Sequence, residues 1–243
     1  RRLSLEGTSV VLLEKAGDIL DGASKGNSAI LHTGFDAPEG SLELECVRNG
    51  YAEYLEIRES LNLPLLKTGA LVTAWTAEEE ERFAGILATA QNNGIDDLRL
   101  LNQQEILAME PHLSGSVRAA ISVPSEFVID PWSAPLAYLS QAVANGGKAF
   151  FNVEVMGGEF TNNHWFLETK RGMVKTTYVI NCAGLYGDLL DDTVLGKREF
   201  TIKPRKGQFV VFDKAASALI QSIILPVPTE RTKGIVIFPT IFG

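Results

Sequence analysis

The pattern of apolar and polar positions opens with a continuous apolar run over residues 9–13, which Glu14 ends. Helix-forming residues and Gly7 precede this run, so the start of the chain predicts the end of a helix, a turn and a buried parallel strand. Helices are further predicted over residues 41–61, 77–93, 103–109 and 131–144. Short strand-like runs predict strands over residues 65–75, 98–101, 119–123 and 127–129.

The second half of the chain is dominated by strand-like patterns, and one predicted strand contains Cys182 as a small buried core residue. Strands are predicted over residues 149–155, 160–169, 173–178, 179–184, 200–213, 223–227 and 234–238. Strand, helix and strand thus recur around an inserted segment of mixed character. This order predicts an α/β fold, α+β in the inserted part, with two interwoven domains.

Composition narrows the possible functions. A formal net charge of -8 argues against a protein that holds nucleic acid by its phosphates. The two cysteines, Cys46 and Cys182, lie far apart, which suggests neither a disulfide framework nor a metal site and favours the cytoplasm. No apolar run approaches the roughly 18 residues of a membrane span, and residues 1–7 lack the layout of a signal peptide. Any membrane association would therefore be peripheral.

Glu14 matches one element of a dinucleotide-binding unit. In a Rossmann unit a glycine-rich turn follows the first strand, and an acidic residue about 20 positions later binds the ribose hydroxyls. Only 13 residues precede Glu14, so we expect the first strand and the glycine loop upstream of Arg1. Residues 239–243 stop without a terminal helix or polar tail, and we expect a cut there too.

Several short motifs together carry a family resemblance. They lie at residues 26–34, 38–42, 127–131, 152–155, 181–184 and 204–208. Their order and spacing resemble FAD-dependent oxidoreductases of the D-amino acid oxidase superfamily, in particular anaerobic-type glycerol-3-phosphate dehydrogenases and L-2-hydroxyglutarate dehydrogenases or oxidases. The resemblance implies a glutathione-reductase-type, Rossmann-like FAD-binding domain interleaved with a mixed-sheet substrate domain. The implied domains cover residues 1–60 with 115–198, and residues 61–114 with 199–243.

The resemblance also implies which residues bind FAD. Glu14 would bond the adenosine ribose, and the loop from Ser24 to His32, with small polar residues, would follow the pyrophosphate and the isoalloxazine edge. The implied cofactor-binding residues are Glu14, Ser24, Lys25, Asn27, Ser28, Val155, Ala183, Gly184 and Asp188. A purely structural interpretation stays open for each: a solvated glutamate, a surface turn, a core valine or a helix cap.

The implied catalytic residues are His32, Lys206 and Arg205. An imidazole beside a flavin accepts a proton from a substrate hydroxyl as hydride leaves the carbon. Arg205 and Lys206 open the strand that the family places over the flavin, where a cation binds a substrate carboxylate or phosphate. The alternatives are a packed, hydrogen-bonded histidine and two solvated cations. Arg231 and Lys233 form a second basic spot that we expect to contact an anionic substrate.

These assignments predict an FAD-dependent dehydrogenase that oxidises a secondary alcohol of a small anionic substrate by hydride transfer to flavin N5. Glycerol 3-phosphate is the first candidate and L-2-hydroxyglutarate the second, since both need basic residues. A hypothesis of another class is a non-catalytic binding domain that keeps the flavoprotein architecture. The sequence leaves open whether the electron acceptor is oxygen, a quinone or a partner subunit.

Overall fold

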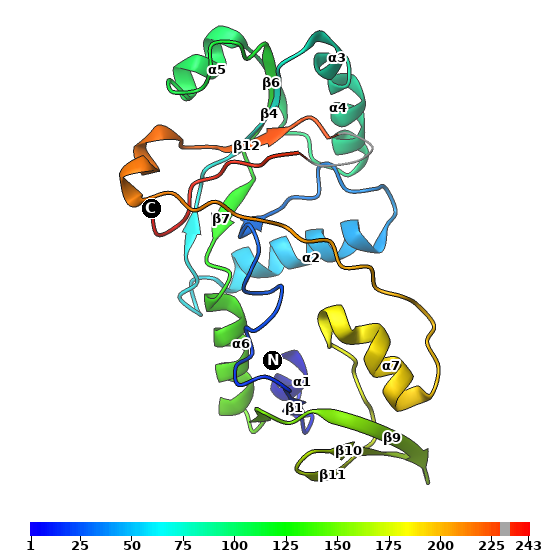
Figure 1. Ribbon diagram of the computed structural model, residues 1–243. Helices are drawn as coiled ribbons and strands as arrows, with labels where there is room; N and C mark the ends of the chain where they lie inside the picture. Colours follow the sequence, from blue (N-terminus) through cyan, green and yellow to red (C-terminus); the bar gives the residue numbers. More distant parts are fainter. Residues whose placement is uncertain (229–233) are drawn as a thin grey trace. The chain divides into compact units, whose positions relative to one another are not determined.

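The computed structural model describes residues 1–228 and 234–243, and its contacts group the chain into two compact units (Figure 1). Arg231 and Lys233, the second basic spot of the sequence analysis, lie outside the described residues. Unit 1 comprises Arg1–Asn27 and Pro131–Phe209, and unit 2 comprises Ser28–Asp130 and Val210–Gly243. The boundaries of the flavin and substrate domains stay a prediction.

Unit 1 is built on a parallel strand pair and a meander. Its strands are β1 (Val11–Leu13), β8 (Lys148–Phe150), β9 (Val155–Thr161), β10 (His164–Thr169) and β11 (Gly172–Thr176). Its helices are α1 (Arg2–Leu5), α6 (Ser133–Ala144), η1 (Gly184–Tyr186) and α7 (Gly187–Leu195). β1 pairs with β8 in parallel, and β9, β10 and β11 form an antiparallel sheet. Arg1 ties α1 to α6 through a 2.6 Å hydrogen bond from Nε to Oε1 of Gln141.

Unit 2 contains a four-stranded mixed sheet in the order β12-β4-β6-β5. Its strands are β4 (Ala70–Ala74), β5 (Arg99–Asn102), β6 (Ala119–Val123) and β12 (Ile223–Pro226), and its helices are α3 (Ala77–Glu80), α4 (Phe83–Asn92) and α5 (Gln103–Met109). Side chains alternate across β4, so that Ala70 and Val72 pack with Phe83 of α4, whereas Leu71 packs with Ile106 of α5. The sheet is therefore covered by a helix on each face (Figure 1).

The same unit holds a three-stranded antiparallel sheet in the order β2-β7-β3. Its strands are β2 (Ile30–Leu31), β7 (Phe127–Ile129) and β3 (Leu65–Leu66), and the helix α2 (Leu42–Ile57) belongs to this unit, as does η2 (Lys214–Leu219). Leu31 pairs with Phe127, and Leu66 pairs with Val128. The central strand β7 therefore places the residues just before it between the ends of β2 and β3.

Most predicted helices and short strands are confirmed, although the helix predicted over residues 77–93 is divided into α3 and α4. Local signals define the ends of several of these elements. Ser41 caps α2 by accepting the backbone N–H of Leu44, and Asn102 with Glu105 forms a capping box at α5. The predicted strand over residues 65–75 is split into β3 and β4 instead. Gly69, with a φ of +64°, turns the chain from one sheet into the other.

The strand predicted over residues 160–169 is divided between β9 and β10 by a turn at Asn162 and Asn163. Four further predicted strands are wrong in whole or in part. The strand over residues 149–155 stops at Phe150, since Asn152 has a φ of 56° and its N–H bonds to the carbonyl oxygen of Ala16. Residues 234–238 contribute one bridge, between Ile237 and Ile224. Residues 179–184 and 200–213 form no strand, because none of the described strands pairs with them.

The side chains of these unpaired segments are accordingly open to solvent. Ile180 is 68% exposed and Val211 is 84% exposed. Cys182, predicted as a buried core residue, is also exposed. The apolar pattern alone therefore did not identify which residues are buried in these segments.

In the described parts of the chain, no helix is both long enough and apolar enough to cross a membrane.

Candidate functional site

Glu14 lies at the carboxyl end of β1, where its backbone is fixed on both sides. Its N–H donates to the carbonyl oxygen of Phe150 at 2.9 Å, and its own carbonyl oxygen accepts the N–H of Val153 at 2.9 Å. One carboxylate oxygen accepts the backbone N–H of Ala16 at 2.8 Å. Each carboxylate oxygen has room for further donors, so the oriented group is suited to a pair of hydroxyls.

The loop that follows is a compact turn rather than an extended segment. The amide of Asn27 donates to the carbonyl oxygens of Ala23 and Ser24, at 3.1 and 3.0 Å. The carbonyl oxygen of Lys25 accepts the indole N–H of Trp132 at 3.4 Å. Ser24 and Lys25 are exposed, and Ser28 is partly buried at the start of the other unit. The amide of Asn27 therefore shapes the turn, whereas the hydroxyl of Ser24 and the amine of Lys25 face solvent.

Three further predicted cofactor residues lie in unit 1 at chain turns or strand ends. Val155 is the first residue of β9, and it is not the last residue of the strand that contains Phe150. Ala183 precedes η1, and its N–H donates to the side-chain oxygen of Asn181 at 3.0 Å. Gly184 has a φ of 56°, and a Cβ there would meet no atom within 4 Å. The backbone at Gly184 therefore lies against open space, as close approach of a ligand requires.

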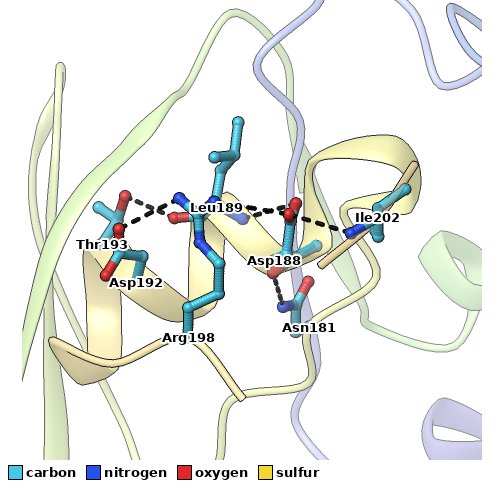
Figure 2. A network of polar contacts seen from close by, with 8 residues as sticks. Asn181, Asp188, Leu189, Asp192, Thr193, Arg198 and Ile202 are labelled. Carbon is cyan, nitrogen blue, oxygen red and sulfur yellow. Dashed lines mark hydrogen bonds and ion pairs between the residues drawn. The ribbon is translucent and has the colours of Figure 1, made fainter. Parts of the chain in front are cut away.

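Asp188 is buried in the first turn of α7 and organises a polar network (Figure 2). Its Oδ1 accepts the N–H of Leu189 at 2.9 Å, and its Oδ2 accepts the N–H of Ile202 at 3.1 Å. The guanidinium of Arg198 lies 3.8 Å from Oδ2. Figure 2 also shows Asn181, whose amide donates to the carbonyl oxygen of Gly187 at 2.8 Å. Oδ1 thus bonds within α7, whereas Oδ2 joins α7 to the following segment, which favours the structural interpretation of Asp188.

His32 directly follows β2 and is paired with a buried carboxylate. Its Nδ1 lies 2.9 Å from Oε2 of Glu126, a side chain that is 0% exposed, whereas the His32 side chain is 44% exposed. Oε1 of Glu126 accepts the backbone N–H of Thr33 at 2.6 Å and its hydroxyl at 2.8 Å. Oε2 is buried and has no hydrogen-bond partner in the described parts of the chain, so its contact with Nδ1 is a close approach rather than an aligned hydrogen bond. The carboxylate therefore holds one edge of an accessible imidazole.

Tyr51 lies near Glu126, and the pKa of its hydroxyl responds to that carboxylate. Its hydroxyl donates to the carbonyl oxygen of Ser125 at 2.8 Å, and its ring stacks on Phe127 with centroids 6.1 Å apart. Burial, followed by the negative charges of Glu126 and Asp97, raises the pKa of Tyr51 above its ordinary value of 10.0, against the side-chain hydrogen bond of Ser125. The Glu126 carboxylate thus lies close to both Tyr51 and His32.

The two predicted cations of unit 1, Arg205 and Lys206, are exposed in an extended segment that belongs to none of the described strands. The strand that they were predicted to open is the one over residues 200–213. Their proposed contact with an anionic substrate stays a prediction.

Glu126 is the residue that the sequence analysis missed. It lies in the Ser125–Glu126 turn between two predicted strands, where a glutamate is usually solvated. The turn is short because β6 ends at Val123 and β7 starts at Phe127. One signal was available in the sequence. Glu126 directly precedes β7, and β7 pairs with β2, the strand that ends just before His32.

The comparisons with known proteins agree over the whole chain. The family model described as DAO, FAD dependent oxidoreductase, matches residues 1–243. A glycerol 3-phosphate dehydrogenase from Caloramator mitchellensis is 31% identical over 243 residues, which are 100% of this chain and 50% of that protein. An L-2-hydroxyglutarate dehydrogenase from Indibacter alkaliphilus is 29% identical over 221 residues, which cover 90% of this chain and 55% of the relative. The chain thus spans about half the length of these curated relatives.

The fold is also found among solved structures. The structure of dithionite-reduced L-alpha-glycerophosphate oxidase from Mycoplasma pneumoniae with FAD bound matches with a TM-score of 0.81 and 22% identity, over 96% of this chain and 62% of that chain. The structure of L-proline dehydrogenase from P. horikoshii matches with a TM-score of 0.69 and 21% identity, over 99% of this chain and 67% of that chain. At these identities the likeness establishes a shared fold.

Proposed function

Because this chain belongs to the DAO family of FAD-dependent oxidoreductases, we propose that the protein binds FAD and oxidises the secondary alcohol of a small anionic substrate, glycerol 3-phosphate first. The observation that carries the proposal is the accessible His32 imidazole backed by the buried carboxylate of Glu126. This pair has the arrangement of a general base with its orienting group. The sequence relative from Caloramator mitchellensis supports glycerol 3-phosphate as the substrate.

The residues of unit 1 fit the adenosine part of FAD. Glu14 offers a carboxylate at the carboxyl end of a parallel strand, the position at which dinucleotide-binding folds bond the ribose. Open space beside Gly184 suits close passage of the chain along a dinucleotide. We therefore assign Glu14 to the ribose and the backbone of Ala183 and Gly184 to the neighbouring part of the cofactor. Asp188 would act indirectly, by holding α7 in place.

His32 supplies the proton chemistry of the proposed reaction. When bound, FAD supplies an acceptor for the hydride that leaves the substrate carbon. His32 takes the hydroxyl proton as the carbon–oxygen double bond forms, so the electron pair of the O–H bond stays with the substrate. Arg205 and Lys206 would bind the anionic group of the substrate, because both are exposed cations that match a phosphate or a carboxylate.

L-2-hydroxyglutarate is the second candidate substrate, which the relative from Indibacter alkaliphilus supports. It too is a secondary alcohol beside an anionic group, so the same base serves both reactions. The decisive experiment incubates the FAD-loaded protein with each compound and a reducible dye under anaerobic conditions. We expect faster dye reduction with glycerol 3-phosphate. Dye reduction with L-2-hydroxyglutarate alone would replace the first candidate with the second, and flavin that neither compound bleaches would contradict both.

The same preparation tests the non-catalytic alternative. A flavoprotein-like binding domain without redox function would keep its visible flavin spectrum unchanged with both compounds. We expect the protein to turn yellow with FAD and to lose the absorbance of oxidised flavin when the substrate is added. A protein that binds FAD, is reduced by dithionite and does not respond to either compound would favour the non-catalytic domain.

A further inference from the structure

We propose that Glu126 is a positioning residue for His32, which fixes the proton of the imidazole on Nδ1 so that Nε2 accepts the hydroxyl proton of the substrate. This inference rests on the proposed function, in which His32 is the base. It adds a residue that no sequence motif had indicated, and it assigns distinct roles to the two ring nitrogens.

The first step is the orientation of the carboxylate. Oε1 of Glu126 accepts two hydrogen bonds from Thr33, from the backbone N–H at 2.6 Å and from the hydroxyl at 2.8 Å. Thr33 is itself buried, at 5% exposure, and lies next to His32 in the chain. The carboxylate therefore cannot rotate without losing two donors, and Oε2 stays directed at the imidazole.

The second step is the choice of tautomer. Oε2 of Glu126 is buried and has no hydrogen-bond donor in the described parts of the chain, and Nδ1 of His32 lies 2.9 Å from it. Because a carboxylate oxygen accepts hydrogen bonds and donates none, a proton on Nδ1 satisfies this oxygen once the ring turns into line with it. In a neutral imidazole the other nitrogen is then the acceptor. Once Nε2 has taken a proton, the ring is a cation that lies against the carboxylate, and this contact stabilises the charge that the reaction creates.

The third step is the register that brings the pair together. Leu31 of β2 pairs with Phe127 of β7, so His32 and Glu126 are the next residues along the two antiparallel strands. Cβ atoms of directly opposed residues lie about 4.5–5.5 Å apart, which is within reach for an imidazole and a carboxylate. The pairing is therefore set by the sheet rather than by a mobile loop.

A purely structural role for Glu126 makes a different prediction. In that case the carboxylate serves only to satisfy Thr33 and to hold β2 beside β7, and the protonation of His32 does not depend on it. The variant Glu126→Gln separates the two roles. Its amide oxygen has to accept both Thr33 donors, which leaves the amide nitrogen facing Nδ1 of His32. An N–H donor at this place forces the proton of the imidazole onto Nε2.

The test combines a spectroscopic and a kinetic measurement. Nitrogen-15 NMR of the purified protein reports which ring nitrogen of His32 is protonated, with His32→Gln identifying its signals among the three histidines. We expect the Nδ1–H tautomer in the wild type and the Nε2–H tautomer in Glu126→Gln. In the FAD-loaded protein, we expect kcat of Glu126→Gln to fall by about 100-fold or more, with KM changed by less than about threefold.

Glu110→Gln is the matched control. Glu110 is also a buried glutamate of the same unit and accepts the backbone N–H groups of Gln221 and Ser222. This substitution perturbs packing and charge by a similar amount without touching His32, so the His32 tautomer and kcat should stay as in the wild type. An equal loss of kcat in both variants would assign Glu126 a structural role and overturn the inference.

The outcomes distinguish this inference from the proposed function. A wild-type His32 protonated on Nε2 overturns the inference even if Glu126→Gln does not fold. An unchanged tautomer or an unchanged kcat in a folded Glu126→Gln does so too. If neither substrate is turned over but the tautomer changes as expected, the proposed function fails while the positioning of His32 by Glu126 stands.

Discussion

The backbone N–H of Ala16 donates a 2.8 Å hydrogen bond to the side-chain carboxylate of Glu14, and so holds it in place just after β1. We predict that Glu14→Ala weakens FAD binding about 10- to 100-fold, the loss expected for hydrogen bonds from ribose hydroxyls to a charged acceptor worth about 1.5–3 kcal/mol. Fluorescence titration with FAD measures the change. Glu159→Ala, which removes an exposed glutamate of β9, is the control. Equal affinities in the two variants would reject Glu14 as the ribose ligand.

Replacement of His32 tests the proposed base directly. We expect His32→Gln to lower kcat by about 10²- to 10⁴-fold, the usual contribution of a general base. FAD affinity should stay within about threefold of the wild type, since the proposed role of His32 is to take a proton from the substrate and not to bind the ribose or the pyrophosphate. His112→Gln is the control, because His112 is exposed. A His32→Gln protein with wild-type turnover would show that another group takes the proton.

Local chemistry explains which parts of the fold could be predicted from the sequence. The capping residues Ser41 and Asn102 act within one turn, so the starts of α2 and α5 were accessible to pattern analysis. A strand needs a partner that is distant in the chain. The alternating pattern of residues 200–213 indicates which side chains would share a face of a strand. It does not indicate whether another strand is present to pair with the backbone of this segment.

Only some residues of the candidate site could be proposed from the sequence. His32 was proposed because a family motif surrounds it, and Glu14 because it ends the predicted strand of a dinucleotide-binding unit. Glu126 was missed because its burial comes from the pairing of β2 with β7, and a glutamate in a short polar turn is usually exposed. The role of Asp188 as a bridge to the N–H of Ile202 likewise depends on a segment 14 residues away.

The contact between α7 and β9 gives a prediction about stability. A Cβ added at Gly158 of β9 would lie 2.8 Å from Cγ1 of Val194 and 3.1 Å from Cδ2 of Leu167. Both are buried, so Gly158→Ala should lower the free energy of unfolding by about 1–3 kcal/mol through overpacking. Urea denaturation measures the loss. Adding Val194→Ala should cost less in the Gly158→Ala background than in the wild type, since it removes the clashing methyl group. If the losses of stability caused by Gly158→Ala and Val194→Ala were strictly additive, α7 would move away from the added methyl group without cost.

The raised pKa of Tyr51 leads to a prediction about alkaline stability. Burial, then the charges of Glu126 and Asp97, favour the neutral phenol in the folded state, so the folded protein binds this proton more tightly than the unfolded chain. The resulting stabilisation is complete below the ordinary pKa of 10.0 and is lost as the pH rises through the higher pKa of the folded state. Tyr51→Phe keeps the ring against Phe127 but has no proton to lose.

We therefore expect the difference in unfolding free energy between the wild type and Tyr51→Phe to be constant from about pH 7 to about pH 9 and to shift against the wild type above about pH 10. Urea denaturation at each pH measures this difference, and the tyrosinate absorbance near 295 nm follows the deprotonation itself. Glu126→Gln removes one of the charges that raise the pKa of Tyr51, so the onset should move to lower pH in that variant. Parallel stability curves for the wild type and Tyr51→Phe across the alkaline range would contradict the raised pKa of Tyr51, and an unchanged onset in Glu126→Gln would contradict the contribution of that carboxylate.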